Sequence, residues 1–299
     1  MDRFESISVF VTVVEAGGFS AASRHLGMPL ATVSRKVSDL EDLLQVRLIN
    51  RSTRRITVTE AGEAFFQSSR EILESLSEAE RAASGEYRTP RGGLTVTAPI
   101  VFGRLHVVPV IVEFLRTYSD VTINLQLVDR LVSLVEEHVD VAVRIGKLPD
   151  SSMVAARIGS IRLVVCGTPQ YLSLRGQPKR PADLLSHDCI TVTNLPMNSK
   201  WRFKSGRSTS LQPVRSRFSV TTAEAGIDAA LAGAGLTQVR CYQVVEAIND
   251  GRLKRVLRDY ETEPVPLSLV HRSARLTPLK LRAFLDFAVP RIKARLQAI

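Results

Sequence analysis

The chain has 299 residues, a net charge of +10 and 44% hydrophobic residues, a composition typical of a soluble globular protein and not of a disordered one. Its length suits one small and one larger domain. The longest nearly apolar run, residues 107–115, is too short to span a bilayer, and the first residues lack the basic and apolar regions of a secretory signal; both exclude a membrane protein and predict a cytoplasmic one.

The positive charge is unevenly distributed, so the net value does not by itself indicate DNA binding. Residues 1–91 hold 12 basic and 13 acidic residues, whereas residues 92–299 hold 28 and 17. Within the first part, however, residues 20–59 carry seven basic residues against three acidic ones. This local excess is the charge pattern expected of a segment that contacts phosphates.

Three short helices are predicted near the N-terminus. Apolar residues at helical spacing indicate the first: Phe4, Ile7, Phe10, Val11 and Val14. Ser20 is expected to cap a second helix over residues 21–26, and Gly27 to allow a sharp turn. One apolar stripe predicts the third: Val33, Val37, Leu40 and Leu44. This order suits a helix-turn-helix, although a plain three-helix bundle with a solvated basic face shares the pattern.

A β-hairpin is predicted directly after these helices, over residues 48–59, where Ile56 and Val58 alternate with polar residues. Arginines crowd its tip, and arginines on such a wing grip phosphates or enter the minor groove. The helices and the wing together give the candidate DNA-contacting residues: Ser20, Leu30, Ala31, Thr32, Ser34, Arg35, Lys36, Arg51, Thr53, Arg54 and Arg55.

A long linker helix is predicted from residue 60 to about residue 87, because no proline interrupts that stretch. Its apolar positions form a heptad seam: Phe65, Ser69, Ile72, Leu76, Ala79 and Ala83. Such a seam either pairs with a second copy of the chain or packs on the chain's own core. Pro90 and Gly92-Gly93 end the helix, so we divide the chain into residues 1–59, a linker and hinge over 60–91, and a domain over 92–299.

Strand and helix patterns alternate in the third part and predict an α/β domain with a mainly parallel sheet. The first set has strands at 94–98, 122–128 and 140–145 and helices at 104–118 and 131–137. The second has strands at 163–167, 189–193, 218–222 and 236–240 and a helix at 223–232. A strand at 268–272 and a helix at 278–296, which Pro290 should kink or split, close the chain. These sets predict two lobes, lobe I at about 92–162 and 266–299 and lobe II at about 163–265.

Two runs in the N-terminal part, AASRHLG at 21–27 and TVSRKVSDLEDLLQVRLINRSTRRITVTEAG at 32–62, resemble the DNA-binding domain of LysR-type transcriptional regulators. Several segments of the C-terminal part resemble the effector-binding domain of that family, which is similar to periplasmic binding proteins: APIVFG, DVAVRIGKLPDSS, TPQYL, PADLLSHDCI and WRF. The resemblance implies an α+β two-part chain with a winged helix-turn-helix, a linker helix and a two-lobed α/β effector domain. It also implies a dimer through residues 60–87 that assembles further into a tetramer, double-stranded DNA as partner, RNA polymerase as a further partner of an activator, and a place at the bacterial nucleoid.

The sequence departs from the family pattern at three places. Pro29 and Leu30 stand where a Ser-Gln-like pair usually begins the recognition helix. Leucine cannot make a bidentate contact to adenine but can touch a thymine methyl, so base reading should shift to Thr32, Arg35 and the wing. In the effector domain, Val239-Arg240 replaces a common Leu-Pro pair, and Thr221-Thr222 replaces an Asn-Asp-like pair.

The effector is expected in the cleft between the lobes, at the carboxyl ends of strands. The candidate residues are Pro99, Ile100, Val101, Phe102, Gly146, Lys147, Trp201, Thr221, Thr222 and Ala223. Residues 157–217 carry eleven basic residues against two acidic ones, so an organic or aromatic acid is the expected small-molecule effector. A solvated basic surface would produce the same count.

Other chemistry finds less support. Cys166, Cys189 and Cys241 are few and widely separated, which suits a reducing compartment and gives no zinc spacing. A redox-responsive regulator using one of them stays open as an alternative, as does a regulator that senses nothing. An α/β enzyme is more remote, because the neighbours His187, Asp188 and Cys189 would point to opposite faces of a strand. No cofactor or metal is expected, and the effector, the operator and the sign of regulation stay open.

Overall fold

A computed structural model describes residues 2–51, 56–83, 89–148, 153–193, 200–206, 208–272 and 277–297. The chain divides into two compact units, residues 1–89 and 90–299. Among the described residues no helix is both long and apolar enough to cross a membrane. The candidate wing residues Thr53, Arg54 and Arg55 lie outside the described residues.

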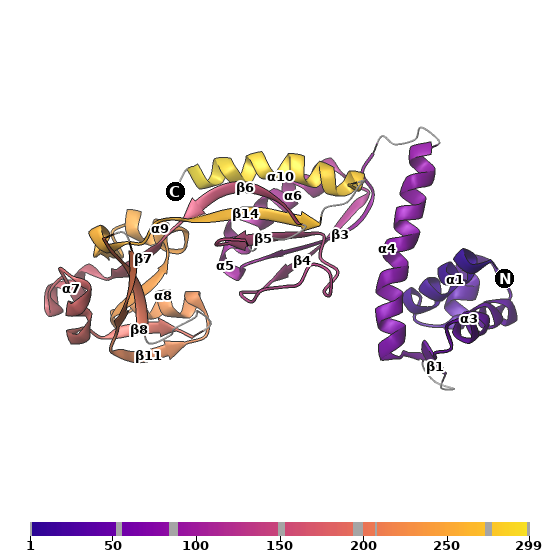
Figure 1. Ribbon diagram of the computed structural model, residues 1–299, viewed down its shortest axis with the longest axis horizontal. Helices are drawn as coiled ribbons and strands as arrows, with labels where there is room; N and C mark the ends of the chain where they lie inside the picture. The colour runs from indigo at the N-terminus through magenta and orange to yellow at the C-terminus, as the bar shows by residue number, and fades with distance from the viewer. Residues whose placement is uncertain are drawn as a thin grey trace. The chain divides into compact units, whose positions relative to one another are not determined.

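The first unit consists of helices and one small hairpin (Figure 1). Its elements are α1 (Arg3–Glu15), α2 (Phe19–Leu26), α3 (Leu30–Leu44), β1 (Ile49–Arg51), β2 (Ile56–Val58) and α4 (Glu60–Ala83). The predicted stripe of α3 is correct, because Val33, Val37 and Leu40 are fully buried beside Phe10 of α1. The hairpin is also as predicted, with antiparallel pairing of Ile49 to Val58.

The turn between α2 and α3 follows from Gly27, whose φ of 63° is left-handed and ends α2. The Ser23 hydroxyl donates to the carbonyl of Met28 at 2.6 Å and ties the turn together. The predicted cap of α2 was wrong. Gly18 precedes the helix, and Ser20 lies exposed inside its first turn. The helix begins earlier than predicted because Gly17 adopts a left-handed turn and Gly18 after it is extended.

The start of α4 is fixed against the strand β1 by the T-E-A-G run. The Thr59 hydroxyl donates to the carbonyl of Arg47 at 2.7 Å and accepts from the amide of Gly62 at 2.9 Å. A Cβ atom at Gly62 would lie 2.0 Å from the carbonyl oxygen of Leu48. Only glycine therefore allows this approach of the helix to the strand.

Gly62→Ala is expected to destabilise the first unit by about 1–3 kcal/mol, the usual cost of forcing an extra carbon into a packed site. Backbone must move for the new atom to fit, since its neighbour is a main-chain oxygen. Urea unfolding of the variant measures the loss. Ala61→Ser, at an exposed neighbouring position, should unfold like the parent chain, and equal midpoints for all three would contradict the packing argument.

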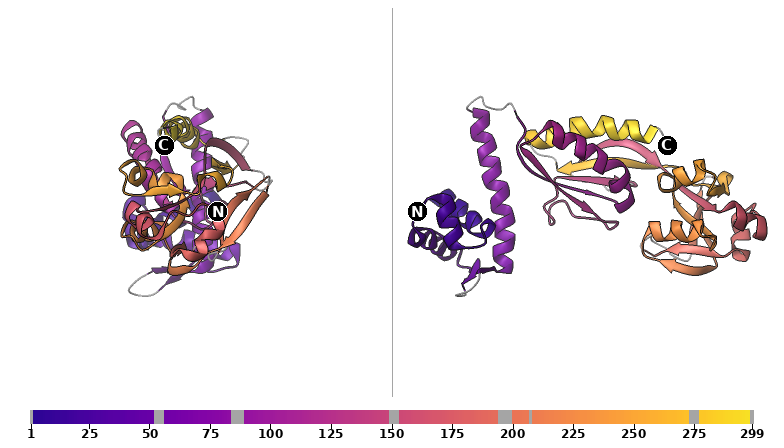
Figure 2. Two further views of the ribbon diagram at one scale, coloured as in Figure 1. Left: turned by 90° about the vertical axis from the view of Figure 1, so that its left-hand side faces the viewer. Right: turned by 180° about the vertical axis from the view of Figure 1, so that it is seen from behind.

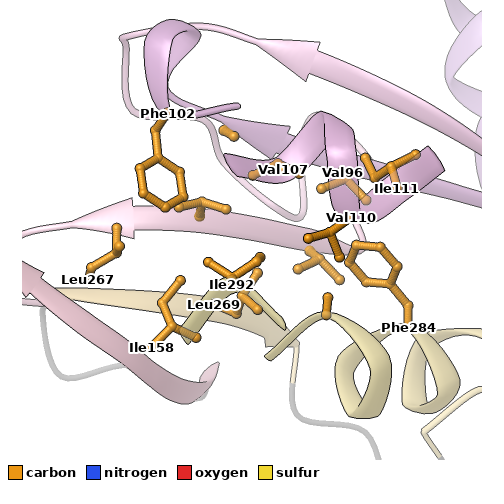
Figure 3. Close-up of a cluster of buried hydrophobic side chains, with 14 of the residues drawn as sticks. Val96, Phe102, Val107, Val110, Ile111, Ile158, Leu267, Leu269, Phe284 and Ile292 are labelled. Atoms are coloured by element: carbon orange, nitrogen blue, oxygen red, sulfur yellow. The ribbon is translucent and has the colours of Figure 1, made fainter. Parts of the chain in front are cut away.

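The second unit contains two five-stranded sheets, one for each lobe (Figure 1). Lobe I has the strand order β4-β3-β5-β14-β6. Its elements are β3 (Gly92–Ala98), α5 (Ile100–Phe102), the π-helical turn η1 (Gly103–Val107), α6 (Val108–Thr117), β4 (Val121–Leu127), β5 (Val141–Ile145), β6 (Met153–Ile161), β14 (Val265–Arg272) and α10 (Leu279–Gln297). Helices α6 and α10 lie on the same face of this sheet (Figure 2), where Phe102, Val110 and Phe284 share one core with Leu267 of β14 (Figure 3).

Lobe II has the strand order β11-β8-β12-β7-β13 and a separate hairpin, β9 with β10. Its elements are β7 (Leu163–Gly167), α7 (Pro169–Arg175), the 3-10 turn η2 (Pro181–Ser186), β8 (Cys189–Val192), β9 (Lys200–Ser205), β10 (Ser208–Pro213), β11 (Ser216–Val220), α8 (Ala223–Leu231), β12 (Leu236–Arg240), α9 (Cys241–Asn249), β13 (Lys254–Val256) and the 3-10 turn η3 (Arg258–Tyr260). Buried clusters on both faces of the sheet hold these helices in place.

Several expectations for the second unit need correction. Both sheets are mixed, not mainly parallel, because β14 pairs antiparallel with β5 and β6, and β7 pairs antiparallel with β12 and β13. Residues 131–137 form turns and no helix. Helix α10 continues through Pro290 without being split. Strands β6, β9, β10 and β13 and helices α7 and α9 were not predicted.

Candidate DNA-reading helix and ligand cleft

The N-terminal turns of α3 present an exposed face. Leu30 is 48% exposed and Ala31 and Arg35 are exposed beside it, while Thr32 and Ser34 are half-buried. This face carries the side chains that were predicted to read bases. No described side chain forms an ion pair or a hydrogen bond with the Arg35 guanidinium, so its five donors are available to a partner.

Lys36 differs from Arg35 in its surroundings. Its ammonium lies 2.5 Å from a carboxylate oxygen of Glu5 in α1, and only 17% of its side chain is exposed. The ion pair connects α3 to α1 and occupies the charge that was assigned to DNA. We therefore give Lys36 a structural role, because a phosphate would have to compete with Glu5 for it.

The base of the wing is fixed by a residue that the sequence analysis did not single out. One carboxylate oxygen of Glu41 accepts hydrogen bonds from the amides of Leu48 and Ile49 at 2.8 and 3.0 Å. The carboxylate thereby holds strand β1 against the end of α3. Arg51 ends β1, so Glu41 fixes the start of the strand that precedes the predicted wing tip.

The predicted apolar seam of α4 has one part that the chain itself covers and one part that is exposed to solvent. Phe65 packs on Phe10 of α1 with ring centroids 5.7 Å apart, and Ser69 is buried. Ile72 is 50% exposed and Leu76 36% exposed. Ala79 and Ala83 carry side chains outside the described part of the structure. The first turns of α4 thus pack on the chain itself, whereas the next two leave an apolar pair in solvent.

The second unit contains a cavity of about 530 Å³ lined by both lobes. Lobe I contributes aliphatic side chains and several charged ones: Thr97, Ala98, Pro99, Val128, Asp129, Arg130, Leu131, Val132, Val143, Arg144, Ile145 and Lys147. Lobe II contributes Val192, Ala223, Val239, Arg240, Tyr242 and Gln243. An apolar hollow with a few convergent polar groups is the usual form of a small-molecule site.

Three of the charged groups that line this cavity already have partners in the protein. Asp129 accepts a hydrogen bond from the amide of Ile100 at 3.1 Å and so caps α5. Arg130 forms a bidentate ion pair with Glu137, which raises the pKa of Arg130 and lowers that of Glu137. Arg144 donates to the carbonyl of Val132.

Lys147 and Arg240 are different, because their side chains form no ion pair or hydrogen bond with any residue that the structure describes. Burial lowers the pKa of Arg240, yet a guanidinium stays protonated at neutral pH. Tyr242 follows it and packs edge-on against Phe102 at 5.3 Å. Burial also raises the pKa of Tyr242, so its phenol is neutral and can donate a hydrogen bond.

The ten candidate effector residues are only partly brought together. Pro99, Lys147 and Ala223 line the cavity. Thr222 caps α8 as predicted, accepting from the amide of Ala225 at 3.3 Å, and Thr221 is exposed beside it. The Ile100 amide is the one that Asp129 holds, and Gly146 donates its amide to the carbonyl of Pro266.

The other three candidates lie elsewhere. Val101 and Phe102 are buried in the core of lobe I, and Trp201 is buried in the core of lobe II. None of these three side chains lines the cavity. Arg240, Tyr242 and Gln243 take their place; the sequence marked Arg240 only as a departure from a family pattern.

Comparison with known proteins identifies both units. Residues 4–63 match the model of the bacterial regulatory helix-turn-helix proteins of the lysR family, and residues 88–293 match that of the LysR substrate binding domain. An HTH-type transcriptional regulator of Xanthomonas campestris pv. campestris is 35% identical over 95% of this chain and 84% of its own length. The HTH-type transcriptional activator AaeR of Escherichia coli K12 is 33% identical over 96% of this chain and 93% of its own.

A solved structure is similar over most of the chain. The full-length virulence activator AphB of Vibrio cholerae, a member of the LTTR family, is similar with a TM-score of 0.62 and 30% identity, covering 96% of this chain and 98% of that one. The matching families and relatives are transcriptional regulators and not enzymes. The chain belongs to the LysR family of bacterial transcriptional regulators, with a helix-turn-helix DNA-binding domain and a two-lobed effector-binding domain.

Proposed function

We propose that this regulator binds double-stranded DNA sequence-specifically and that a small organic or aromatic acid, bound between the lobes, controls the contact. One observation carries the ligand class: Lys147 of lobe I and Arg240 of lobe II line the same apolar cavity, and neither side chain has an ion-pair or hydrogen-bond partner among the described residues. Two such cations favour a carboxylate, which each can hydrogen-bond.

Each of the three parts of the chain has its own function in this scheme. Residues 1–59 read DNA, residues 60–91 link and pair subunits, and residues 92–299 bind the effector between lobe I (about 92–162 and 266–299) and lobe II (about 163–265). We further propose a homodimer that assembles into a tetramer, contact with RNA polymerase if the protein activates, and a place at the nucleoid in the bacterial cytoplasm.

The effector proposal is tested by thermal unfolding of the full chain with benzoate and with benzamide, its neutral analogue. A ligand that binds only the native state stabilises it by about 2.7 kcal/mol at one hundred times its dissociation constant. Benzoate should raise the melting temperature and benzamide should not. Stabilisation by neutral ligands alone would count against an acidic effector.

Arg35→Ala is expected to lower operator affinity by about 1–3 kcal/mol, roughly ten- to hundredfold, and to reduce the preference for operator over random DNA. The reason is that Arg35 is an exposed cation of α3, on the face that we propose enters the groove. Arg54→Ala, in the wing, should lower affinity similarly for both duplexes. Fluorescence anisotropy with both duplexes decides between these outcomes, and an unchanged affinity of Arg35→Ala would remove it from the reading face.

The redox alternative finds no support at two of the three cysteines. Cys166 and Cys189 are buried, and burial raises the pKa of each thiol to about 12, so the reactive thiolate is scarce at neutral pH. Cys241, at the start of α9, is partly exposed. Peroxide is expected to leave operator affinity within about twofold of the untreated value, in the parent chain and in Cys241→Ser alike. A larger change that Cys241→Ser abolishes would restore the redox reading.

A further inference from the structure

A second cavity, of about 620 Å³, adjoins the ligand cleft. Lys147 and Arg240 line both cavities, so the two meet at this pair of cations. The remaining lining comes from the two chain crossings between the lobes and from the β9–β10 hairpin: Ile161, Arg162, Leu163, Arg202, Lys204, Gly206, Ser208, Thr209, Thr262, Glu263, Pro264, Val265 and Pro266.

The second cavity is strongly cationic. It is lined by five basic residues and by the single carboxylate of Glu263. Two of the basic residues are already paired, Lys204 with Glu263 at 3.0 Å and Arg162 with Glu261 at 3.7 Å. Lys147, Arg240 and Arg202 remain, and in the part of the chain that the structure describes no carboxylate forms an ion pair with any of these three.

The structure fixes Arg202 close to Arg240. The side-chain amide of Gln238 in β12 accepts from the main-chain amide of Arg202 at 3.3 Å and donates to its carbonyl at 3.0 Å. Gln238 and Arg240 are two residues apart on one strand, so they point to the same face. Both arginines line the second cavity.

Two guanidinium groups that line one cavity repel each other, and a single carboxylate beside Lys147 and Arg240 leaves Arg202 without a counter-charge. A second anionic group would remove that repulsion. The first cavity differs, because half of its lining is aliphatic and its other charged side chains, Asp129, Arg130 and Arg144, already have partners in the protein. The aliphatic side chains of the first cavity suit an uncharged body, with the charges of the ligand directed toward Lys147 and Arg240 and into the second cavity.

We propose that the effector is a dianion: an apolar body in the first cavity, one carboxylate between Lys147 and Arg240, and a second acidic group in the second cavity beside Arg202. This inference rests on the proposed function and names the ligand class of the same cleft. Lys147 belongs to lobe I, whereas Arg202 and Arg240 belong to lobe II. A bound dianion would thus neutralise cations of both lobes and favour their approach.

The test compares two ligands that differ by one carboxylate, phenylsuccinate and 3-phenylpropionate, by isothermal titration calorimetry on the full chain at constant ionic strength. Phenylsuccinate is expected to bind at least tenfold more tightly. Arg202→Gln should reduce this preference to about twofold and leave the affinity for 3-phenylpropionate unchanged. The Arg202 side chain is exposed, so the variant should fold, and circular dichroism checks this.

Arg252→Gln is the matched control, because it removes an exposed lobe II arginine that pairs only with Asp250 in the described part of the chain. It should retain the full preference, which excludes a general attraction of the basic protein for dianions. Equal affinities of the two ligands in the parent chain, or a preference that survives Arg202→Gln, would overturn the dianion and leave an acidic effector standing. Failure of both ligands to bind would overturn the dianion together with the acidic effector.

Discussion

Replacing both Ile72 and Leu76 by aspartate is expected to convert the proposed dimer into a monomer and to lower operator affinity at least a hundredfold. These side chains lie four residues apart on α4, so they share one face of the helix. They are half and one-third exposed, respectively, and neither belongs to the buried cluster of the first unit. Exposed apolar pairs at heptad spacing are what a partner helix covers.

The loss of affinity is expected because dimerisation through α4 joins two copies of the DNA-reading helix α3. A dimer binds two half-sites, and its second half binds at an effective concentration in the millimolar range, which adds about 10²–10⁴ to the affinity without any new contact. Two carboxylates in the seam would repel their counterparts in the partner helix. The substitution therefore acts on DNA binding without altering the α3 face.

Sedimentation velocity at micromolar concentration and anisotropy with the operator measure the two effects. Gln67→Glu, five residues before Ile72 and therefore on another face of the same helix, adds one carboxylate outside the seam and should remain a dimer with near-parental affinity. Circular dichroism should show equal helix content in all three proteins. A double variant that stays dimeric would place the interface elsewhere and leave α4 as a helix that serves its own chain.

The first unit could be predicted well because its signals are local. The stripe of α3 and the left-handed Gly27 each depend on a few neighbouring residues, and the wing strands follow from simple alternation. The prediction of the cap of α2 was wrong for a local reason as well, since Gly18 and Ser20 are both residue types that commonly precede a helix. What could not be predicted is which half of the α4 seam its own chain would cover.

In the second unit the errors arise where tertiary contacts override a weak local pattern. Residues 131–137 have helical spacing, but a seven-residue helix is unstable alone. Glu137 pairs instead with Arg130 and accepts a hydrogen bond from the amide of Ser133. Leu134 packs in a small separate core with Val132, Val139 and Ala142. These contacts bend the segment into turns.

Of the residues predicted for the cleft, Lys147 and Ala223 line the cavity, whereas Trp201 is buried in the core of lobe II. Strand alternation, applied to β9, would have corrected this: Trp201 and Phe203 are buried, whereas Arg202 and Lys204 are exposed and line the second cavity. The mixed strand order had a different origin, because the return of β14 between β5 and β6 is a long-range pairing with no local signal.

His106→Phe is expected to stabilise the effector domain, and more strongly at pH 5 than at pH 7. His106 lies in the π-helical turn η1 and is 7% exposed. Neither ring nitrogen has a hydrogen-bond partner among the described residues. The ring stands 4.8 Å from Phe102 and 5.8 Å from Tyr242, centroid to centroid, so a phenyl ring of similar shape fits the same aromatic group.

The pH dependence follows from the pKa of the buried imidazole. Burial, with a smaller contribution from the charge of Arg295, lowers it from 6.5 to about 4. Below pH 6.5 the unfolded chain takes up a proton that the native protein accepts only near pH 4. The contribution of neutral His106 to stability is therefore complete above about pH 6.5 and is lost as the pH falls toward 4, by about 3 kcal/mol in all and about 2 kcal/mol by pH 5.

Urea unfolding at pH 7, 6 and 5 measures this slope before most carboxylates titrate. The parent chain should lose about 2 kcal/mol more than His106→Phe over that range, because phenylalanine has no proton to gain. The variant should also be more stable at pH 7, since two buried polar atoms without partners are removed. His25→Asn, at an exposed position of α2, should keep the parental slope. Parallel pH curves for the parent chain and His106→Phe would mean that the imidazole is solvated or hydrogen-bonded in solution, and the aromatic group between the lobes would then have to be open to water.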